Sequence, residues 1–186
     1  MIAPPGTWPI DAERSRVEFA IKHMLLATLR GRFESFHGVL QVAEDGLAQA
    51  SGSVDAASIC THDAVRDGHL RSSSDFFDVG RYPQIGFSSS RIEELPGGHV
   101  RILGDLTMRG VTREIELSGQ AREREPRGAD PELALALQGE LNRREFGLIW
   151  NQTLDSGGAL IGNTVKIAVE LAAVRAAGAA DQPARR

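Results

Sequence analysis

Apolar and polar residues alternate along most of this chain, a pattern that is typical of half-buried β-strands. In Arg16–His23, for example, Val17, Phe19 and Ile21 alternate with polar or small residues. The pattern predicts eight strands, over Arg16–His23, Leu29–Val42, Ser51–Ile59, Gln84–Ile92, His99–Met108, Thr112–Arg122, Glu132–Asn142 and Ile161–Val174. Short turn-rich segments separate most of these strands, so we expect antiparallel pairing.

One segment, His62–Phe77, shows no alternation. Its residues Val65, His69 and Leu70 have the spacing of one face of a helix. We therefore expect one short helix with a loop, inserted after the third strand.

Eight two-faced antiparallel strands avoid exposed edges either by closing into a barrel or by stacking as a sandwich. Several of the predicted strands are longer than the usual five or six residues, which favours the barrel. A change of apolar register near Ser35 predicts a bulge that bends the sheet. Small residues occupy many inward positions, namely Gly31, Gly38, Ser89, Gly104, Gly119 and Gly139. The sequence thus predicts an all-β, eight-stranded antiparallel barrel with a long, narrow, apolar cavity.

The composition fits one globular domain and argues against several classes of protein. The chain has 186 residues, and we expect one domain over 1–175 followed by a disordered tail over 176–186. Its net charge of −4 does not favour nucleic-acid binding, which needs a clustered basic field. Cys60 is the single cysteine, so neither an internal disulfide nor a zinc finger is expected. The first residues lack the pattern of a signal peptide, which predicts a cytoplasmic protein.

Several short strings occur in an order that is specific to a known family. They are Trp8-Pro-Ile-Asp11, Ser15-Arg-Val-Glu-Phe19, His23-Met24, Gly31-Arg-Phe33, Phe36-His-Gly38, Arg66-Asp67-Gly-His-Leu-Arg71, Asp75-Phe-Phe-Asp78, Tyr82-Pro83, Phe87, Gly104-Asp-Leu-Thr-Met-Arg-Gly-Val-Thr112 and Arg144-Glu-Phe-Gly147. Together, from about Thr7 to Val174, they resemble the YceI-like family. The resemblance implies an extended, lipocalin-like, eight-stranded barrel that binds a polyisoprenoid or similar long apolar lipid, often as a dimer. The resemblance also implies export for many members of the family, whereas no signal peptide is expected for this chain.

The expected lining of the cavity consists of apolar residues at inward strand positions and of residues in the helical insertion. These lipid-binding candidates are Phe19, Ile21, His23, Phe33, Phe36, Leu70, Phe76, Phe77, Phe87, Leu106 and Met108. Each apolar member has an alternative role in simple core packing. His23 is either a hydrogen-bonded interior histidine or a polar partner for a quinone oxygen or lipid head group.

Guanidinium groups suit an anionic head group such as pyrophosphate, because they donate two parallel hydrogen bonds. Five arginines come into question, namely Arg66, Arg71, Arg81, Arg143 and Arg144, and we take Arg66, Arg71 and Arg144 as the head-group candidates. The alternative is that these arginines are solvated at the surface.

No metal or cofactor is expected. His62, Asp63, Asp67 and His69 are potential metal ligands, but the two histidines lie seven residues apart, about 10 Å along a helix. Asp67 is instead expected to cap the helix or to pair with an arginine. No nucleophile-elbow GxSxG motif occurs.

The sequence thus favours a non-enzymatic protein that binds, stores or transports a polyisoprenoid lipid of the quinone or prenyl phosphate class. We expect residues 62–80 to gate lipid transfer, and we expect transient contact with a membrane and a homodimer. One alternative is an enzyme with His23, Asp67 or His69 as the acid or base. Another is a stress-related, partner-binding module with a filled barrel.

Overall fold

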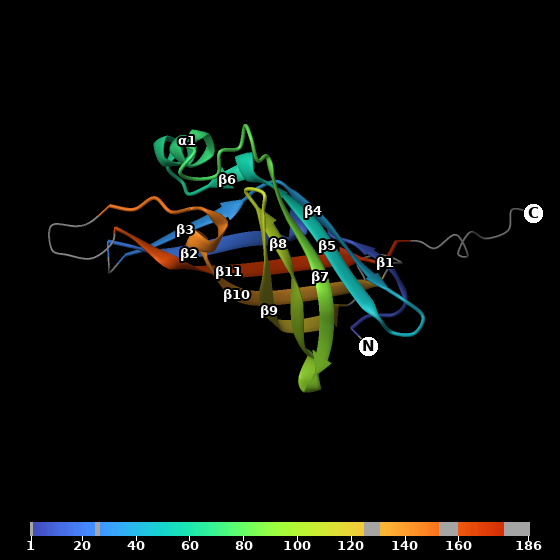
Figure 1. The fold of residues 1–186 in the computed structure, drawn as a ribbon. Helices are drawn as coiled ribbons and strands as arrows, with labels where there is room; N and C mark the ends of the chain where they lie inside the picture. Colours follow the sequence, from blue (N-terminus) through green and yellow to red (C-terminus); the bar gives the residue numbers. More distant parts are fainter. Residues whose placement is uncertain (1, 25–26, 125–130, 153–159, 177–186) are drawn as a thin grey trace, which may run out of the picture.

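The computed structural model describes residues 2–24, 27–124, 131–152 and 160–176. Within these ranges the strands form one antiparallel sheet in the order β1-β4-β5-β7-β8-β9-β10-β11-β2-β3-β6 (Figure 1). The strands are β1 (Gly6–Pro9), β2 (Arg16–His23), β3 (Ala27–Phe33), β4 (Phe36–Val42), β5 (Ala48–Asp55), β6 (Ile59–Cys60), β7 (Gln84–Leu95), β8 (His99–Met108), β9 (Val111–Arg124), β10 (Glu132–Asn142) and β11 (Ile161–Val174).

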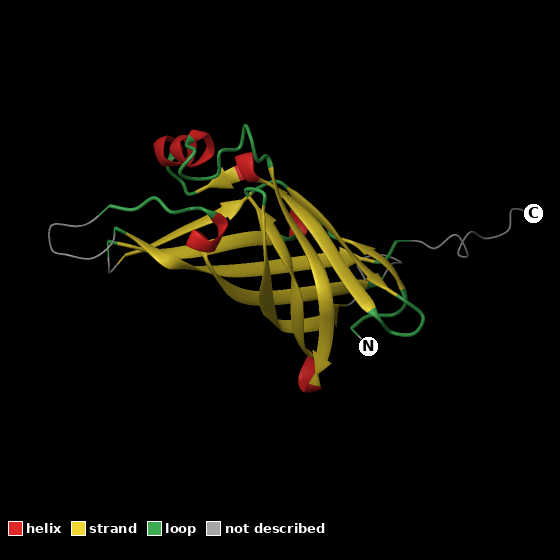
Figure 2. Cartoon of the chain, viewed as in Figure 1, coloured by secondary structure: helices red, strands yellow, loops and turns green. Residues whose placement is uncertain are grey.

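Helical structure is sparse and lies at the ends of the strands (Figure 2). The α-helix α1 (Ala64–Ser72) follows β6, and four short 3₁₀ helices are η1 (Ala12–Arg14), η2 (Ala56–Ser58), η3 (Pro96–Gly98) and η4 (Arg143–Phe146) in the described part of the chain. The predicted helical insertion is confirmed, and α1 begins at Asp63, whose side chain accepts a hydrogen bond from the Arg66 N–H. No helix in the described ranges is long and apolar enough to cross a membrane.

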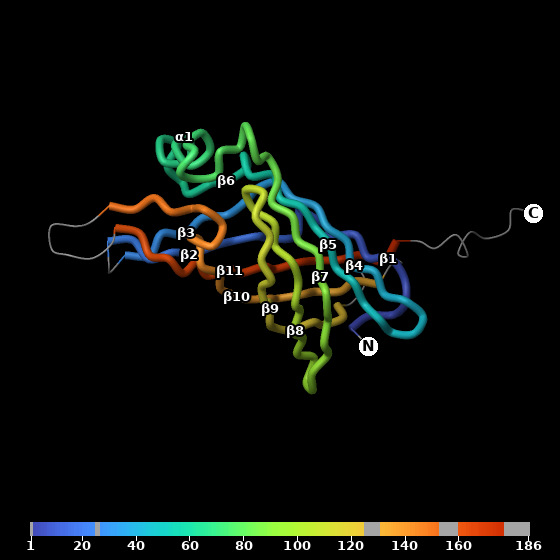
Figure 3. The backbone as a smooth tube through the Cα atoms, viewed as in Figure 1, coloured from blue at the N-terminus to red at the C-terminus, as the bar shows by residue number. Residues whose placement is uncertain are grey.

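The sheet is strongly curled, as the backbone trace shows (Figure 3). β1 pairs with β4 at one end of the sheet order, and its neighbour Ile10 forms an isolated bridge to Ala173 of β11. Two backbone hydrogen bonds of 2.8 Å, from Asp11 to Ala172 and from Ala176 to Thr7, continue this contact. The N-terminal strand therefore lies between β4 and the end of β11.

The predicted antiparallel all-β architecture is confirmed, but the described residues form eleven separate strands and not the eight expected. The predicted strand Leu29–Val42 is two strands, β3 and β4, and β1 and β6 were not expected. The break at residues 34–35 has a physical cause in η2 and the residues beside it. Glu34 N–H donates to Ser58 O (3.2 Å), and Ser35 O accepts from Asp55 N–H (2.9 Å).

Buried apolar side chains form two clusters. The larger contains Trp8, Leu40, Leu133 and Ile102, with the N-terminal Ile2 packed among them. The smaller contains Ala56, Ile85, Met108, Phe146 and Leu148, and Phe76, Phe77 and Val79 after α1 pack against it. The predicted disordered tail lies, except for Ala176, outside the described residues.

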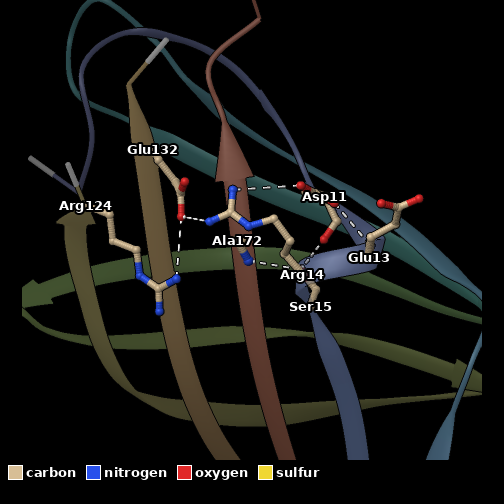
Figure 4. Close-up of polar contacts among 7 residues, drawn as sticks. All are labelled: Asp11, Glu13, Arg14, Ser15, Arg124, Glu132 and Ala172. Carbon is tan, nitrogen blue, oxygen red and sulfur yellow. Dashed lines mark hydrogen bonds and ion pairs between the residues drawn. The ribbon is translucent and has the colours of Figure 1, made fainter. Parts of the chain in front are cut away.

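η1 is fastened to the last two strands by a buried carboxylate (Figure 4). Glu132, which is 3% exposed, accepts a hydrogen bond of 2.5 Å from Arg14 and lies 3.5 Å from an Arg124 nitrogen. The hydrogen bond from Arg14 is the main reason that the pKa of Glu132 is lowered. Ser15 adds a second link, because its Oγ accepts from Ala172 N–H at 2.9 Å.

We predict that Glu132→Gln lowers the free energy of unfolding at pH 7 and that this difference shrinks at acid pH. A lowered carboxylate pKa contributes stability that is complete above the unfolded value, 4.5, and is lost as the pH falls through the folded value. Chemical denaturation of both proteins between pH 3 and 7 measures the effect. Glu123→Gln, at an exposed position nearby, is the matched control and should show no such pH dependence. A destabilisation of Glu132→Gln that is the same at all pH values would contradict the prediction.

Candidate functional site: an apolar cavity inside the curled sheet

The curled sheet encloses a cavity of about 310 Å³, which falls in the range of small-molecule sites. Strands β2 to β11 contribute to its lining, and so do α1 and the segment after it. Both buried clusters contribute to its lining, Ile2 and Leu40 from the larger and Met108 and Leu148 from the smaller. The lining is almost entirely apolar, so the site suits an apolar ligand.

Ten of the eleven lipid-binding candidates lie together around this cavity. They are Phe19, Ile21, Phe33, Phe36, Leu70, Phe76, Phe77, Phe87, Leu106 and Met108. The eleventh, His23, is the last residue of β2 and is not among the lining residues. The structure therefore brings the aromatic and aliphatic candidates together and leaves the histidine apart.

Interior glycines provide space for aromatic rings on neighbouring strands. Gly31 pairs with Phe19 across β2 and β3, and a Cβ at Gly31 would lie 2.3 Å from Phe19 Cζ. At Gly104 a Cβ would lie 2.5 Å from Phe87 Cζ. The expected cavity is present, but the space beside Gly31 and Gly104 is filled by the rings of Phe19 and Phe87.

A cap covers one end of the cavity, and we use this name for residues 62–82. Leu70, Phe76 and Phe77 of the cap line the cavity. Phe77 contacts Phe33 of β3 edge-on, with ring centroids 5.9 Å apart, and Phe76 lies 5.5 Å from Trp150. The cap is thus held by aromatic contacts to two different parts of the rim.

Arg109 fastens the cap to the segment after η4. It occupies the two-residue turn between β8 and β9, where its φ of 53° and that of Gly110, 72°, fit the mirror-image turns of tight hairpins. Its guanidinium donates to Ser74 O at 2.7 Å and to Gly147 O at 2.6 Å. One side chain therefore bridges the two segments that close this end.

Asp67 anchors α1 to the chain before it, and the prediction that it caps the helix or pairs with an arginine is wrong. Asp63 is the cap residue, and Asp67, which is buried, accepts from both the backbone N–H (2.9 Å) and the hydroxyl (2.5 Å) of Thr61. Arg66 also donates to the Thr61 hydroxyl, at 2.7 Å. In the described chain no three His, Cys, Asp or Glu side chains are placed to hold a metal ion.

The predicted head-group arginines lie outside the cavity lining. Arg66 donates to both side chain and carbonyl of Thr61, and Arg71 donates to Ile59 O at 2.7 Å. Arg144 is exposed. None of the three lines the cavity.

Arg143 is the arginine that lines the cavity. It is 4% exposed and donates from Nε to Gly162 O at 2.8 Å and from Nη1 to Leu148 O. Burial, and secondly the charge of Arg144, lower its pKa. Its inward direction follows from η4, because residues three apart in a 3₁₀ helix share a face, so Arg143 and Phe146 are buried while Arg144 and Glu145 are exposed.

These features define an all-β protein whose curled antiparallel sheet surrounds an apolar binding cavity under a helical cap. The chain belongs to the YceI-like family, since the model of the YceI-like domain matches residues 8–173.

Relatives and solved structures agree with this assignment. A UPF0312 protein of Staphylococcus aureus (strain USA300) is 29% identical over 162 residues, which are 84% of this chain and 90% of that protein. BcnA of Burkholderia cenocepacia has a similar structure, with a TM-score of 0.72 at 22% identity over 88% of this chain and 98% of the other. A polyisoprenoid binding domain from Saccharophagus degradans gives a TM-score of 0.65 at 16% identity, over 91% and 98% of the two chains. At such identities the structural likeness shows a shared fold.

We predict that Gly31→Ala displaces the Phe19 ring and lowers the free energy of unfolding by about 1–3 kcal/mol, the usual effect of overpacking. Urea denaturation measures the change in stability, and a crystal structure of the variant locates the ring. Gly86→Ala in β7 is the matched control, because a Cβ there meets no atom within 4 Å. Equal stability of Gly31→Ala and Gly86→Ala would contradict the prediction.

Proposed function

We propose that this protein binds a long apolar lipid of the polyisoprenoid class in its cavity and acts as a carrier or store. The observation that carries the proposal is an apolar cavity of about 310 Å³ inside the sheet, with a cap over one end. Because the lining provides almost no hydrogen-bonding groups, a ligand must gain its affinity from apolar area.

We infer further that the curled sheet acts as a closed, eight-stranded, lipocalin-like barrel. β1 and β2 flank η1, while β3 and β4 flank residues 34–35, and each pair works as one interrupted strand. The first composite strand pairs with the second along its length and also contacts β11, so the series of neighbours returns to its start. Counted in this way, eight strands surround the cavity, and β6 is a short addition at the rim.

The energetics of chain burial support a long ligand. Each CH₂ group removed from water contributes about 0.8 kcal/mol. Association costs about 4–15 kcal/mol in lost freedom. A chain of several isoprene units therefore exceeds this cost without any polar contact. The Saccharophagus domain of the same fold, described as polyisoprenoid binding, is consistent with this ligand class.

The cavity favours this role over the two alternatives. An enzyme that works in the cavity needs its acid or base there, but none of His23, Asp67 and His69 lines it. A partner-binding module with a filled barrel has no use for such a cavity. Location in the cytoplasm, a homodimer and transient contact with a membrane stay predictions from the sequence.

We predict that affinity rises with prenyl chain length, from geraniol through farnesol to geranylgeraniol, by about tenfold or more for each added unit until the cavity is full. Displacement of a fluorescent apolar probe measures the dissociation constants. Ala50→Phe, at a lining position of β5, should reduce the affinity for the longest alcohol and keep the circular dichroism spectrum. Affinity that is independent of chain length, together with lipid-free protein from the native host by mass spectrometry, would refute the carrier role.

We predict that Arg109→Met increases the rate of lipid release by about tenfold. The two hydrogen bonds that bridge the cap and the segment after η4, to Ser74 O and Gly147 O, are lost, and each contributes about 0.5–1.5 kcal/mol. Stopped-flow transfer of a fluorescent prenyl lipid to acceptor vesicles measures the rate. Arg81→Met is the matched control, because both arginines lie over the Tyr82 ring. The guanidinium carbon is 5.2 Å from the ring centroid in Arg81 and 5.9 Å in Arg109. Equal release rates for Arg109→Met and Arg81→Met would show that the bridge does not gate the cavity.

A further inference from the structure

We propose that residues 2–5, which we call the plug, close the cavity at the end away from the cap and set the length of the chain that the protein prefers. The side chain of Ile2 is the stop that the end of a bound chain meets. This role rests on the proposed function and adds to it the residue that determines chain length.

The plug lies at the end of the sheet where β10 begins. The guanidinium of Arg175 donates to Pro5 O at 2.8 Å, and the backbone N–H of Arg175 donates at 3.1 Å to Pro131 O, directly before β10. β10 then extends over about 33 Å and leads into η4, whose Phe146 belongs to the cluster against which the cap packs. The N-terminus and α1 accordingly lie on opposite sides of the molecule (Figure 1).

The cavity stops before the strands end on the side of the plug. Leu135 of β10 and Leu171 of β11 are paired, and both line the cavity. Alternation makes Leu133 and Ala173 the next inward pair towards the plug. Both are 0% exposed, but neither belongs to the lining. The interior is therefore filled at this last level of the sheet.

The plug and Trp8 are what fills it. Ile2, Ala3 and Trp8 are buried, and they belong to the same core cluster as Leu133 and Ala173. Of these five residues, Ile2 alone lines the cavity. Ile2 precedes β1 and is not part of the wall that the strands form. Its side chain is therefore the apolar floor of the cavity at this end.

Hydrogen bonds and backbone restriction hold the plug in place. The indole N–H of Trp8 donates to Pro4 O at 3.1 Å, and Arg175 holds Pro5 as described above. The two proline rings fix φ at successive residues. Gly6, with φ 145°, then takes a conformation that favours glycine and directs the chain into β1. A segment fastened in this way resists a longer chain, whereas a loose N-terminal segment would give way to it.

The size of residue 2 should therefore limit the length of chain that the cavity buries. Ile2→Ala opens room for roughly half an isoprene unit, and each CH₂ group buried there adds to the affinity. Ile2→Phe removes room at the same place. The two substitutions should shift the preferred length in opposite directions.

The test uses prenyl alcohols of two to nine isoprene units, from geraniol to solanesol, which displace a fluorescent apolar probe from the full chain. In the wild type we expect the affinity to rise up to one length, the limiting length, and then to stay constant. Ile2→Ala should bind the next longer alcohol about tenfold more tightly than the wild type does. Ile2→Phe should bind the alcohol of limiting length about tenfold more weakly. Both variants should bind the shortest alcohols within about threefold of the wild type.

Val42→Ala is the matched control for a loosened core. Val42 belongs to the same core cluster as Ile2 and is similarly buried, but it does not line the cavity. We expect this substitution to lower stability and to leave the limiting length unchanged. Ile2→Ala and Val42→Ala decide the outcome by themselves should Ile2→Phe not fold.

The outcomes separate this role from the proposed function. A limiting length that is the same in the wild type and the Ile2 variants would overturn the role of the plug, and so would an equal shift in Val42→Ala. A wild-type affinity that rises through the whole series would overturn it as well. Each of these results leaves lipid binding in the cavity intact, whereas a wild-type protein that binds none of the alcohols would overturn both.

Discussion

The structure depends on one constraint. The backbone N–H and C=O groups at the edges of the curled sheet must form hydrogen bonds, and they do so where the N-terminal strand meets β11. β1 is only four residues long, but it pairs with β4 and its neighbours bond to the end of β11. η1 interrupts the strand at this point, and the contacts of Arg14 with Glu132 and of Ser15 with Ala172 hold the interruption against β10 and β11. Because these contacts keep the sheet curled, its apolar face turns inward and surrounds a space.

The interior balances packing against volume. The ring of Phe19 lies over Gly31 and that of Phe87 over Gly104, so the rings fill the space beside the backbone at these two glycines. The two ends are closed by different means. Trp8 and the N-terminal residues pack into one end as part of the larger core cluster, whereas the other end is covered by a cap that a few aromatic contacts and Arg109 hold. We therefore expect a ligand to exchange at the cap, because fewer buried contacts must break there.

Much of the fold and of the lining could be predicted from the sequence, since alternation along a strand directly encodes its inner face. This is why ten of the eleven candidates line the cavity. His23 does not line it, because the alternation of β2 continues to the end of the strand, beyond the part that faces the cavity. The missing strand β1 is too short for alternation to show. The break between β3 and β4 depends on hydrogen bonds of Glu34 to Ser58 and of Ser35 to Asp55, which lie 24 and 20 residues away along the chain. No local pattern contains that information.

The arginines show why a polar site is harder to predict than an apolar one. Arg143 and Arg144 are adjacent and chemically identical, and a strand or an open turn gives no reason to prefer either. The choice comes from η4, where Asn142 caps the first turn, Gly147 with φ 77° ends it, and three-residue spacing pairs Arg143 with the apolar Phe146. The sequence does contain the residues that predict this 3₁₀ turn, namely the polar cap Asn142, the aromatic Phe146 and the terminating Gly147. A predicted 3₁₀ turn would have indicated which of the two arginines is buried. Arg66 and Arg71 carry no such signal, because their partners Thr61 and Ile59 are backbone or hydroxyl groups that only the folded cap brings near.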